Sequence, residues 1–367
     1  MAKNVVIVGG GFGGVSLAKQ LAGARDLHVT LVNEHNYTTF SPMLPEVVSS
    51  TVLPGQVIAP LRQMLGADQD FVMGRVLDVD FERRIVTHGF GERTGEIPFD
   101  HLVFALGARA PLEMIPGMAE HGIALKLIGD AMQVRNRVIA RLERADRIDD
   151  AAERRRLGHF VVVGGGFSGI EVAGEIDDFV KAAVRFYPNI SREELRVSIV
   201  HTGDRILPEL PARLAEKATR SMRRRGMAIH LAAKATAADA DGLDIERADG
   251  TRDRLEAATL VSTIGTGANP LLQTLDLPRQ RGRLVTRPDM SVEGMAQVWA
   301  LGDCAAVPNR ATGAPAPPTA QFAVRQGRIL AWNIRAIEAG RATRAFDYAG
   351  LGTIATIGSQ RGIADVM

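Results

Sequence analysis

The chain has one cysteine, nearly balanced positive and negative charges and no long apolar run. Cys304 is its single cysteine among 367 residues, so an intrachain disulfide and a CxxC redox pair are both excluded, and a reducing, cytoplasmic compartment is expected. The formal net charge is +2, which gives no general attraction to nucleic acid. No apolar run reaches the ~18–20 residues of a membrane span. A glycine motif already begins at Gly9, which leaves no room for a signal peptide before it.

Glycine, by contrast, is abundant, and it follows a short apolar run near the start of the chain. Residues 4–8 read as a strand buried on both faces, residues 15–22 as a helix and residues 27–32 as a second strand. This context makes the GxGxxG between them a dinucleotide-binding turn, in which the first glycine permits the tight turn, the second lets the backbone approach a pyrophosphate and the third lets the helix pack on the strand. The turn residues expected to contact a cofactor are Gly9, Gly11, Phe12, Gly13 and Gly14.

The same pattern returns halfway along the chain. A strand at 159–163 precedes a second glycine turn, a helix at 170–180 and another strand at 195–200. The string Val-Gly-Gly-Gly-Phe occurs in both units, which indicates an internal repeat of one nucleotide-binding design. The cofactor-binding residues expected in the second turn are Gly164, Gly166, Phe167 and Gly169.

An acidic residue at the end of the second strand of such a unit usually binds the ribose, but neither unit of this chain has an acid at that position. In the first unit Asn33 occupies that position and Glu34 follows it, and the sequence leaves open which of them contacts the ribose. In the second unit the position is His201, with Arg205 four residues on. A histidine does not repel a 2′-phosphate as a carboxylate would, so the sequence does not exclude NADPH as an alternative to NADH.

Two glutamates follow the second turn. Glu171 and Glu175 lie one helical turn apart on one face, where they could simply favour the helix dipole. The alternative is that Glu171 faces the cofactor and contacts nicotinamide or relays a proton. Asp303 follows Gly302 at the end of another expected strand and could bind a ribitol hydroxyl.

Coarser features complete the pattern. Residues 130–157 read as one helix with Asp130 as N-cap, residues 319–337 as another, and strands are expected within 251–264 and 283–301. The arginine clusters at 154–156 and 223–225 read as solvated helix ends. We assign no metal site.

The order of these motifs resembles the two-dinucleotide-domain flavoproteins of the pyridine nucleotide oxidoreductase family. It comprises the two glycine turns, Ala105-Leu106-Gly107, the 171–175 string Glu-Val-Ala-Gly-Glu and Ala-Leu-Gly-Asp at 300–303. The segments 40–45, Phe-Ser-Pro-Met-Leu-Pro, and 318–321, Pro-Thr-Ala-Gln, look like those of type II NADH dehydrogenase, the non-pumping NADH:quinone oxidoreductase.

The resemblance implies an α/β fold with two Rossmann-like dinucleotide-binding domains, the second inserted in the first. FAD would bind residues 1–110 and 281–340, NAD(P)H would bind residues 111–280, and residues 341–367 would begin a C-terminal region that stops short. Hydride would pass from NAD(P)H to flavin N5 and two electrons then to a quinone. Glu171 would sit at the nicotinamide and Gln321 at the quinone, as the catalytic residues. The further residues implied to contact a cofactor are Pro42, Leu44, Ala105, Gly107, Gly265, Gly302, Asp303 and Ala320.

Several departures leave alternatives open. Arg325, with Gln326 next to it, stands where the family often has a second glutamine. The chain also stops before the amphipathic helices that hold such enzymes on a membrane, so membrane contact would be peripheral, on the cytoplasmic face, and dependent on a region not present. A protein acceptor such as a ferredoxin or rubredoxin, or a redox-sensing role, are the alternatives to a quinone. Sulfide oxidation is a further possibility, but it normally needs paired cysteines near the flavin, and the single cysteine argues against it. The oligomeric state stays open, with a homodimer as one option.

Overall fold

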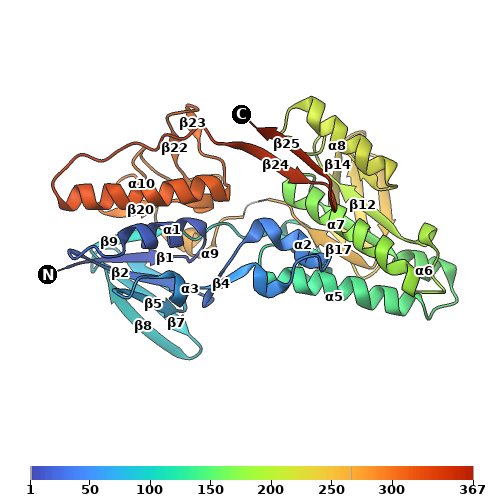
Figure 1. Cartoon of the computed structure of the whole chain (residues 1–367), viewed down its shortest axis with the longest axis horizontal. Coiled ribbons are helices and arrows are strands. Elements are labelled where there is room, and N and C mark those ends of the chain that lie inside the picture. Colours follow the sequence, from blue (N-terminus) through green and yellow to red (C-terminus); the bar gives the residue numbers. More distant parts are fainter. Residues whose placement is uncertain (1, 266, 367) are drawn as a thin grey trace. The chain divides into compact units, whose positions relative to one another are not determined.

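The computed structural model describes residues 2–265 and 267–366, which form two compact units. The first comprises Met1–Thr39, Ile58–Arg109 and Thr266–Gly350, and the second comprises Phe40–Val57, Ala110–Gly265 and Leu351–Met367. Each unit is built on its own five-stranded parallel sheet (Figure 1). The predicted α/β fold with two Rossmann-like sheets is confirmed.

The sheet of the first unit has the strand order β20-β9-β1-β2-β5, with every pair parallel. Its strands are short and apolar because both faces of the sheet are covered. The central strand runs from Lys3 to Val8, and Val5, Val6 and Ile7 have no exposed surface. The elements of this unit are β1 (Lys3–Val8), α1 (Phe12–Leu21), β2 (Leu27–Asn33), β3 (Tyr37–Thr39), β4 (Ile58–Pro60), α3 (Leu61–Met64), β5 (Gln69–Met73), β6 (Arg75–Asp80), β7 (Ile85–Phe90), β8 (Arg93–Pro98), β9 (His101–Phe104), α9 (Pro270–Thr274), β18 (Arg279–Gln280), β19 (Arg283–Val285), β20 (Val298–Ala300), β21 (Ala305–Ala306), β22 (Pro308–Asn309), β23 (Ala314–Pro315) and α10 (Ala320–Glu338).

Helix α10 packs against α1, and the two helices lie next to each other in Figure 1. Their backbones approach closely because both carry glycine at the crossing. A Cβ atom on Gly327 would lie 2.7 Å from the carbonyl oxygen of Gly13. The helix expected over residues 319–337 is confirmed, and Phe322, Leu330 and Ile334 are among its buried side chains. This packing brings the C-terminal helix of the unit beside its first glycine turn.

The sheet of the second unit has the strand order β10-β17-β11-β12-β13 and is again parallel throughout. Strand β11 corresponds to β1, since it also precedes a glycine turn and a helix. The elements of this unit are α2 (Leu44–Val48), α4 (Met118–His121), β10 (Gly122–Ala124), α5 (Ile128–Ala145), α6 (Ala151–Leu157), β11 (His159–Val163), α7 (Phe167–Ala183), β12 (Arg196–Val200), α8 (Ala212–Arg224), β13 (Ala228–His230), β14 (Ala233–Ala238), β15 (Gly242–Arg247), β16 (Arg252–Glu256), β17 (Thr259–Ser262), β24 (Gly352–Thr356) and β25 (Gly362–Val366).

Two segments distant in sequence pack on α7 of this unit. Helix α2 contacts both α5 and α7, and the hairpin β24–β25 lies on α7 through β24 (Figure 1). The hairpin approaches closely at Gly174, where a Cβ atom would lie 2.6 Å from the backbone nitrogen of Gly358. The amino-terminal part of α7 is thereby enclosed by elements from both ends of the chain.

The helix predicted over residues 130–157 is wrong in detail, because the structure divides it into α5 and α6. The chain leaves the helix after Ala145, and the carboxylate of Asp150 caps α6 by accepting from the N–H of Ala152 at 2.8 Å. Asp130 is not an N-cap. It lies inside the first turn of α5, where its carboxylate accepts from the N–H of Leu127 at 2.8 Å.

The arginine clusters are also only partly solvated. Arg154 pairs with Glu194 at 2.7 Å, and Arg225 pairs with Asp177 at 2.8 Å with 12% of its side chain exposed. Arg225 also donates to the carbonyl of Ile357, so it ties α8 to α7 and to the C-terminal hairpin. Composition alone did not distinguish these buried pairs from a charged surface.

Among the helices built from residues 2–265 and 267–366, none is long and apolar enough to cross a membrane.

Candidate functional site

In the first glycine turn, two glycines are required by the packing of the protein itself and a third is not. Gly9 has φ +116°, and a Cβ atom there would collide with the carbonyl oxygen of Ala105. A Cβ atom on Gly14 would collide with the carbonyl oxygen of Gly9. A Cβ atom on Gly11 would meet no protein atom within 4 Å. The open space at Gly11 therefore fits a phosphate that approaches the backbone.

The second turn repeats this arrangement. Gly164 has φ +122°, and a Cβ atom there would collide with the hydroxyl of Thr263. A Cβ atom on Gly169 would collide with the carbonyl oxygen of Gly164. At Gly166 the nearest atom would be a carboxylate oxygen of Glu209, at 3.8 Å. The space at the second glycine of the motif is thus again left almost open.

The two helix starts match closely. Gly11 has φ −81° and ψ −168°, and Gly166 has φ −78° and ψ −172°. Helices α1 and α7 then begin at Phe12 and Phe167, and neither N-terminus has a side-chain cap. Uncapped N–H groups and the positive end of a helix dipole suit an anionic pyrophosphate. The sequence repeat is therefore also a repeat of backbone geometry.

Asn33, one predicted ribose ligand, has its side chain occupied within the first unit. Its Oδ1 accepts from the N–H of Gly10 at 2.8 Å, and its Nδ2 donates to the carbonyl of His35 at 2.8 Å. The amide thus braces the glycine turn. Glu34 is paired at the surface with Arg75 at 2.9 Å. The choice between Asn33 and Glu34 as ribose ligand stays a prediction.

His201 lies directly beside the second glycine turn. Its Nδ1 accepts from the N–H of Gly165 at 3.2 Å, so that ring nitrogen carries no proton. Burial lowers the pKa of His201, and the ring is therefore neutral near pH 7. Arg205 is exposed, and its guanidinium donates to the carbonyl of Pro208 at 3.0 Å.

Two carboxylates that sequence reasoning missed stand near this position. Asp204 and Glu209 both act to raise the pKa of His201, so their charges reach the imidazole. Glu209 also lies nearest to the open space at Gly166. No local pattern singles it out, because it follows the strand in an irregular loop. Negative charge at this place opposes a 2′-phosphate.

Glu171 lies on the side of α7 that carries the C-terminal hairpin. Its carboxylate accepts from the backbone N–H of Thr356, on β24, at 3.2 Å. Burial raises the pKa of Glu171 to about 7; the bond from Thr356 opposes this rise, and the charges of Glu46 and Glu175 add to it. A carboxyl group with this pKa holds or releases a proton at neutral pH.

Glu175 joins a small group of carboxylates around Glu171. Only 3% of Glu175 is exposed, and it accepts a hydrogen bond from the hydroxyl of Ser49, next to α2. Burial raises the pKa of Glu175 and of Glu46 as well. The first turn of α7 contains no acidic residue, so a helix-dipole role does not account for Glu171 or Glu175.

The Gly302-Asp303 turn in the first unit is held by a buried glutamine. Gly302 has φ +71°, and its N–H donates to Oε1 of Gln326, of which 1% is exposed, at 2.7 Å. Asp303 is thereby positioned directly after β20. Burial raises the pKa of the neighbouring Cys304 thiol to about 11, so it stays protonated and is no nucleophile. The sequence pattern gives no sign of this role of Gln326, because the bond joins segments that are distant in sequence.

Gln321 lies one residue after Ala320, which begins α10, as the sequence predicted. Its Oε1 accepts from the hydroxyl of Tyr348 at 3.1 Å. The guanidinium of Arg325 lies 4.7 Å from the centre of the Tyr348 ring. The family's second glutamine position is thus occupied by a cation that packs on the aromatic partner of Gln321.

The remaining predicted residues have distinct local settings. Gly107 has φ +63° with open space around it, and Gly265 has φ +66° with the ring of Pro111 nearby. Pro42 is exposed and Leu44 is buried, both within the second unit. Their predicted contacts with cofactors stay predictions.

Comparison with known proteins gives consistent matches over most or nearly all of the chain. The family model of the pyridine nucleotide-disulphide oxidoreductases matches residues 3–327. The type II NADH:quinone oxidoreductase Ndh of Mycobacterium tuberculosis is 30% identical over 99% of this chain and 79% of its own length. The type II NADH:quinone oxidoreductase of Staphylococcus aureus is 28% identical over 99% of this chain and 90% of its own length.

Solved structures agree with the fold. NDH2 of Plasmodium falciparum in complex with NADH superposes with a TM-score of 0.93 at 20% identity, over 100% of this chain and 90% of that one. At this identity the match supports the arrangement of elements and not the chemistry of individual side chains.

Proposed function

Because this chain belongs to the pyridine nucleotide-disulphide oxidoreductase family and, within it, to the type II NADH:quinone oxidoreductases, we propose that it is an FAD-dependent NAD(P)H:quinone oxidoreductase. The observation that carries this proposal is the pair of matched glycine turns. Each leaves space at its second glycine, Gly11 or Gly166, which suits one dinucleotide in each unit. A bound flavin would supply the redox chemistry, taking a hydride from the nicotinamide and passing two electrons to a quinone.

The residues of the first unit would bind and orient FAD. The N–H groups at the start of α1 would bind its pyrophosphate, with Gly11 allowing the close approach. Asp303 would accept hydrogen bonds on the flavin side, and Gln326 fixes the turn that carries it. The amide of Gln321, already oriented by Tyr348, would bind a quinone carbonyl.

The residues of the second unit would bind the nicotinamide cofactor. The start of α7 would hold its pyrophosphate, and Glu171 would contact the nicotinamide or hold the proton that the reaction requires. A pKa of about 7 suits that second task, because both protonation states are populated at neutral pH. The neutral ring of His201 tolerates a 2′-phosphate, whereas Glu209 opposes one. We therefore expect NADH to be preferred and NADPH to be accepted more weakly.

We also propose peripheral contact with the cytoplasmic face of a membrane, where quinones dissolve. The resemblance placed such contact on amphipathic helices outside the hairpin, whereas exposed apolar side chains support a contact through the hairpin itself. Leu351, Ile354 and Val366, in and beside it, are each 64–65% exposed. Changing Ile354 to Asp should weaken binding to phosphatidylglycerol vesicles in a sedimentation assay, while Leu77→Asp, in the first unit, should not. Equal binding of both variants would contradict this assignment. Light scattering would distinguish a monomer from a homodimer, the option that the sequence left open.

The absorption spectrum of the purified protein tests the proposed function. We expect flavin bands that bleach on anaerobic addition of NADH and return when a soluble quinone is added. Bleaching without recovery by any of several quinones would contradict quinone reduction and favour a protein acceptor or a sensing role. A colourless protein that binds no added FAD would contradict the proposal entirely.

A further inference from the structure

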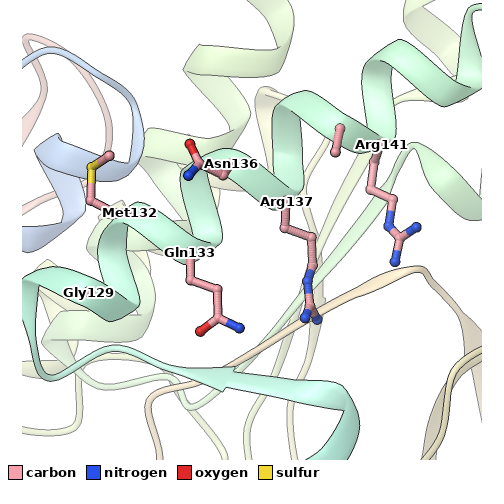
Figure 2. Close-up of a pocket in the computed structure, with 7 residues that line it drawn as sticks. Gly129, Met132, Gln133, Asn136, Arg137 and Arg141 are labelled. Carbon is pink, nitrogen blue, oxygen red and sulfur yellow. The ribbon is translucent and has the colours of Figure 1, made fainter.

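A shallow, largely open groove of about 590 Å³ runs along α5 in the second unit. Figure 2 shows Gln133, Arg137 and Arg141 in a row along one edge of the helix, each one turn after the last. The lining residues are Gly129, Met132, Gln133, Asn136, Arg137, Ala140 and Arg141. They include two cations, two amides and no acid.

Both guanidinium groups are held by backbone carbonyls. Arg137 donates to the carbonyl of His121 at 2.9 Å, and Arg141 donates to the carbonyl of Ala258 at 3.3 Å. A guanidinium has five N–H donors, so most of them stay available on each side chain. Burial lowers the pKa of Arg137 and of Arg141, which means that the positive charge is poorly solvated where it stands.

The charge of Glu153 reaches Arg141 and acts to raise the pKa of its guanidinium, but the two side chains do not pair. Within residues 2–265 and 267–366, neither Arg137 nor Arg141 forms an ion pair, and two further arginines add to the field at Arg141. Those two, Arg144 and Arg156, are already paired with Glu153 at 3.0 and 2.7 Å.

Other nearby acids are likewise engaged. Asp241 pairs with Arg156 at 3.0 Å. The carboxylate of Asp130, at the start of α5, accepts from the backbone N–H groups of Lys126 and Leu127. The groove thus keeps a surplus of positive charge with directed donors, which is the chemistry that recognises an oxyanion.

The groove is distinct from the nucleotide site of the same unit. His121 precedes β10 and Ala258 precedes β17, so the two carbonyls lie at the amino-terminal edge of the parallel sheet. Gly164 follows β11, at the opposite edge. A strand of four residues separates the edges by roughly 10 Å or more.

We propose that this groove binds a small soluble anion carrying phosphate groups, held between Arg137 and Arg141 with the amide of Gln133 as a further donor. The groove is open to solvent, and its two half-buried guanidinium groups, one helical turn apart, suit a compact anion. The inference does not depend on quinone reduction.

Inorganic pyrophosphate is a suitable probe in isothermal titration calorimetry at constant ionic strength. The FAD-loaded protein is first saturated with NAD⁺, so that both glycine turns are occupied. We expect saturable binding that Arg137→Gln and Arg141→Gln each weaken at least about tenfold. The control Arg223→Gln, on the exposed side of α8, should bind like the unchanged protein.

No saturable binding of pyrophosphate, or equal binding by all four proteins, would overturn the proposal. So would a result in which Arg137→Gln and Arg141→Gln weaken binding to anionic vesicles but not to pyrophosphate. Rates of NADH oxidation check that each variant is folded and loaded. If Arg137→Gln does not fold, Arg137→Lys retains the charge without the planar fork and should also weaken binding.

Discussion

The carboxylate of Glu171 accepts a hydrogen bond at 3.2 Å from the backbone N–H of Thr356, 185 residues later in the chain. The contact joins the helix that follows the second glycine turn to a hairpin near the C-terminus. This hydrogen bond lowers the pKa of Glu171, but burial of the carboxylate and the negative charges of Glu46 and Glu175 together raise that pKa by more. Glu171 is therefore protonated more readily than an ordinary glutamate.

This protonation should appear in the pH dependence of stability. The folded chain keeps a proton on Glu171 up to a pH of about 7, whereas an unperturbed glutamate loses it near 4.5. The free energy of unfolding should therefore fall as the pH rises from 4.5 to 7, and the loss should be complete above 7. Glu171→Gln should remove this pH-dependent loss of stability, and should therefore stabilise the protein at pH 8 by at most about 3 kcal/mol. Urea unfolding at pH 5 and pH 8 measures it, with exposed Glu216→Gln as the control. An unchanged pH slope would refute the shift.

The open space at Gly11 predicts a selective effect on FAD. Gly11→Val should block the approach of the pyrophosphate and leave the purified protein largely without flavin. Gly55→Val is the matched control, because a Cβ atom at Gly55 also meets no protein atom within 4 Å. Flavin content per chain, from absorbance after denaturation, should fall only in the first variant. Full occupancy in Gly11→Val would rule out this turn as the FAD site.

Charge beside the second glycine turn should set the choice of nicotinamide cofactor. We expect kcat/KM with NADPH to lie within about tenfold of that with NADH, a difference of ~1.4 kcal/mol. Glu209→Gln should move the ratio towards NADPH, and His201→Glu should move it towards NADH by repulsion of the 2′-phosphate. Steady-state rates with both cofactors measure the ratio, and Glu216→Gln is again the control. A ratio unaffected by either change would show that this loop does not face the ribose.

The two half-reactions should separate under mutation. Gln321→Ala should leave flavin reduction by NADH near its original rate and slow reoxidation by quinone several-fold, since the lost amide concerns the acceptor alone. Glu171→Gln should disturb nicotinamide binding or the protonation step instead. Stopped-flow bleaching and recovery of the flavin absorbance measure each half. Tyr348→Phe tests whether the hydroxyl that orients Gln321 contributes, and should give a smaller effect in the same direction. Normal reoxidation of Gln321→Ala by several quinones would remove Gln321 from the site.

The sequence by itself determined the two glycine turns and the sheets around them. Each turn is a strand, a tight bend and a helix within a short stretch, so neighbouring residues define its geometry. Gly9 and Gly164 require positive φ, and the apolar runs before them require a sheet covered on both faces. The order of these units along the chain was then enough to indicate the family.

Only the tertiary structure decided how the polar residues are used. Asn33 braces Gly10, Gln326 holds Gly302, and Glu171 meets Thr356, none of which is visible in a local pattern. Such bonds join segments that are distant in sequence, and their strength depends on burial and on surrounding charge, which a side chain acquires only when the chain has folded. For the same reason the pKa of Glu171 follows from the packing of three separate segments, and not from the glutamate or its neighbours in sequence.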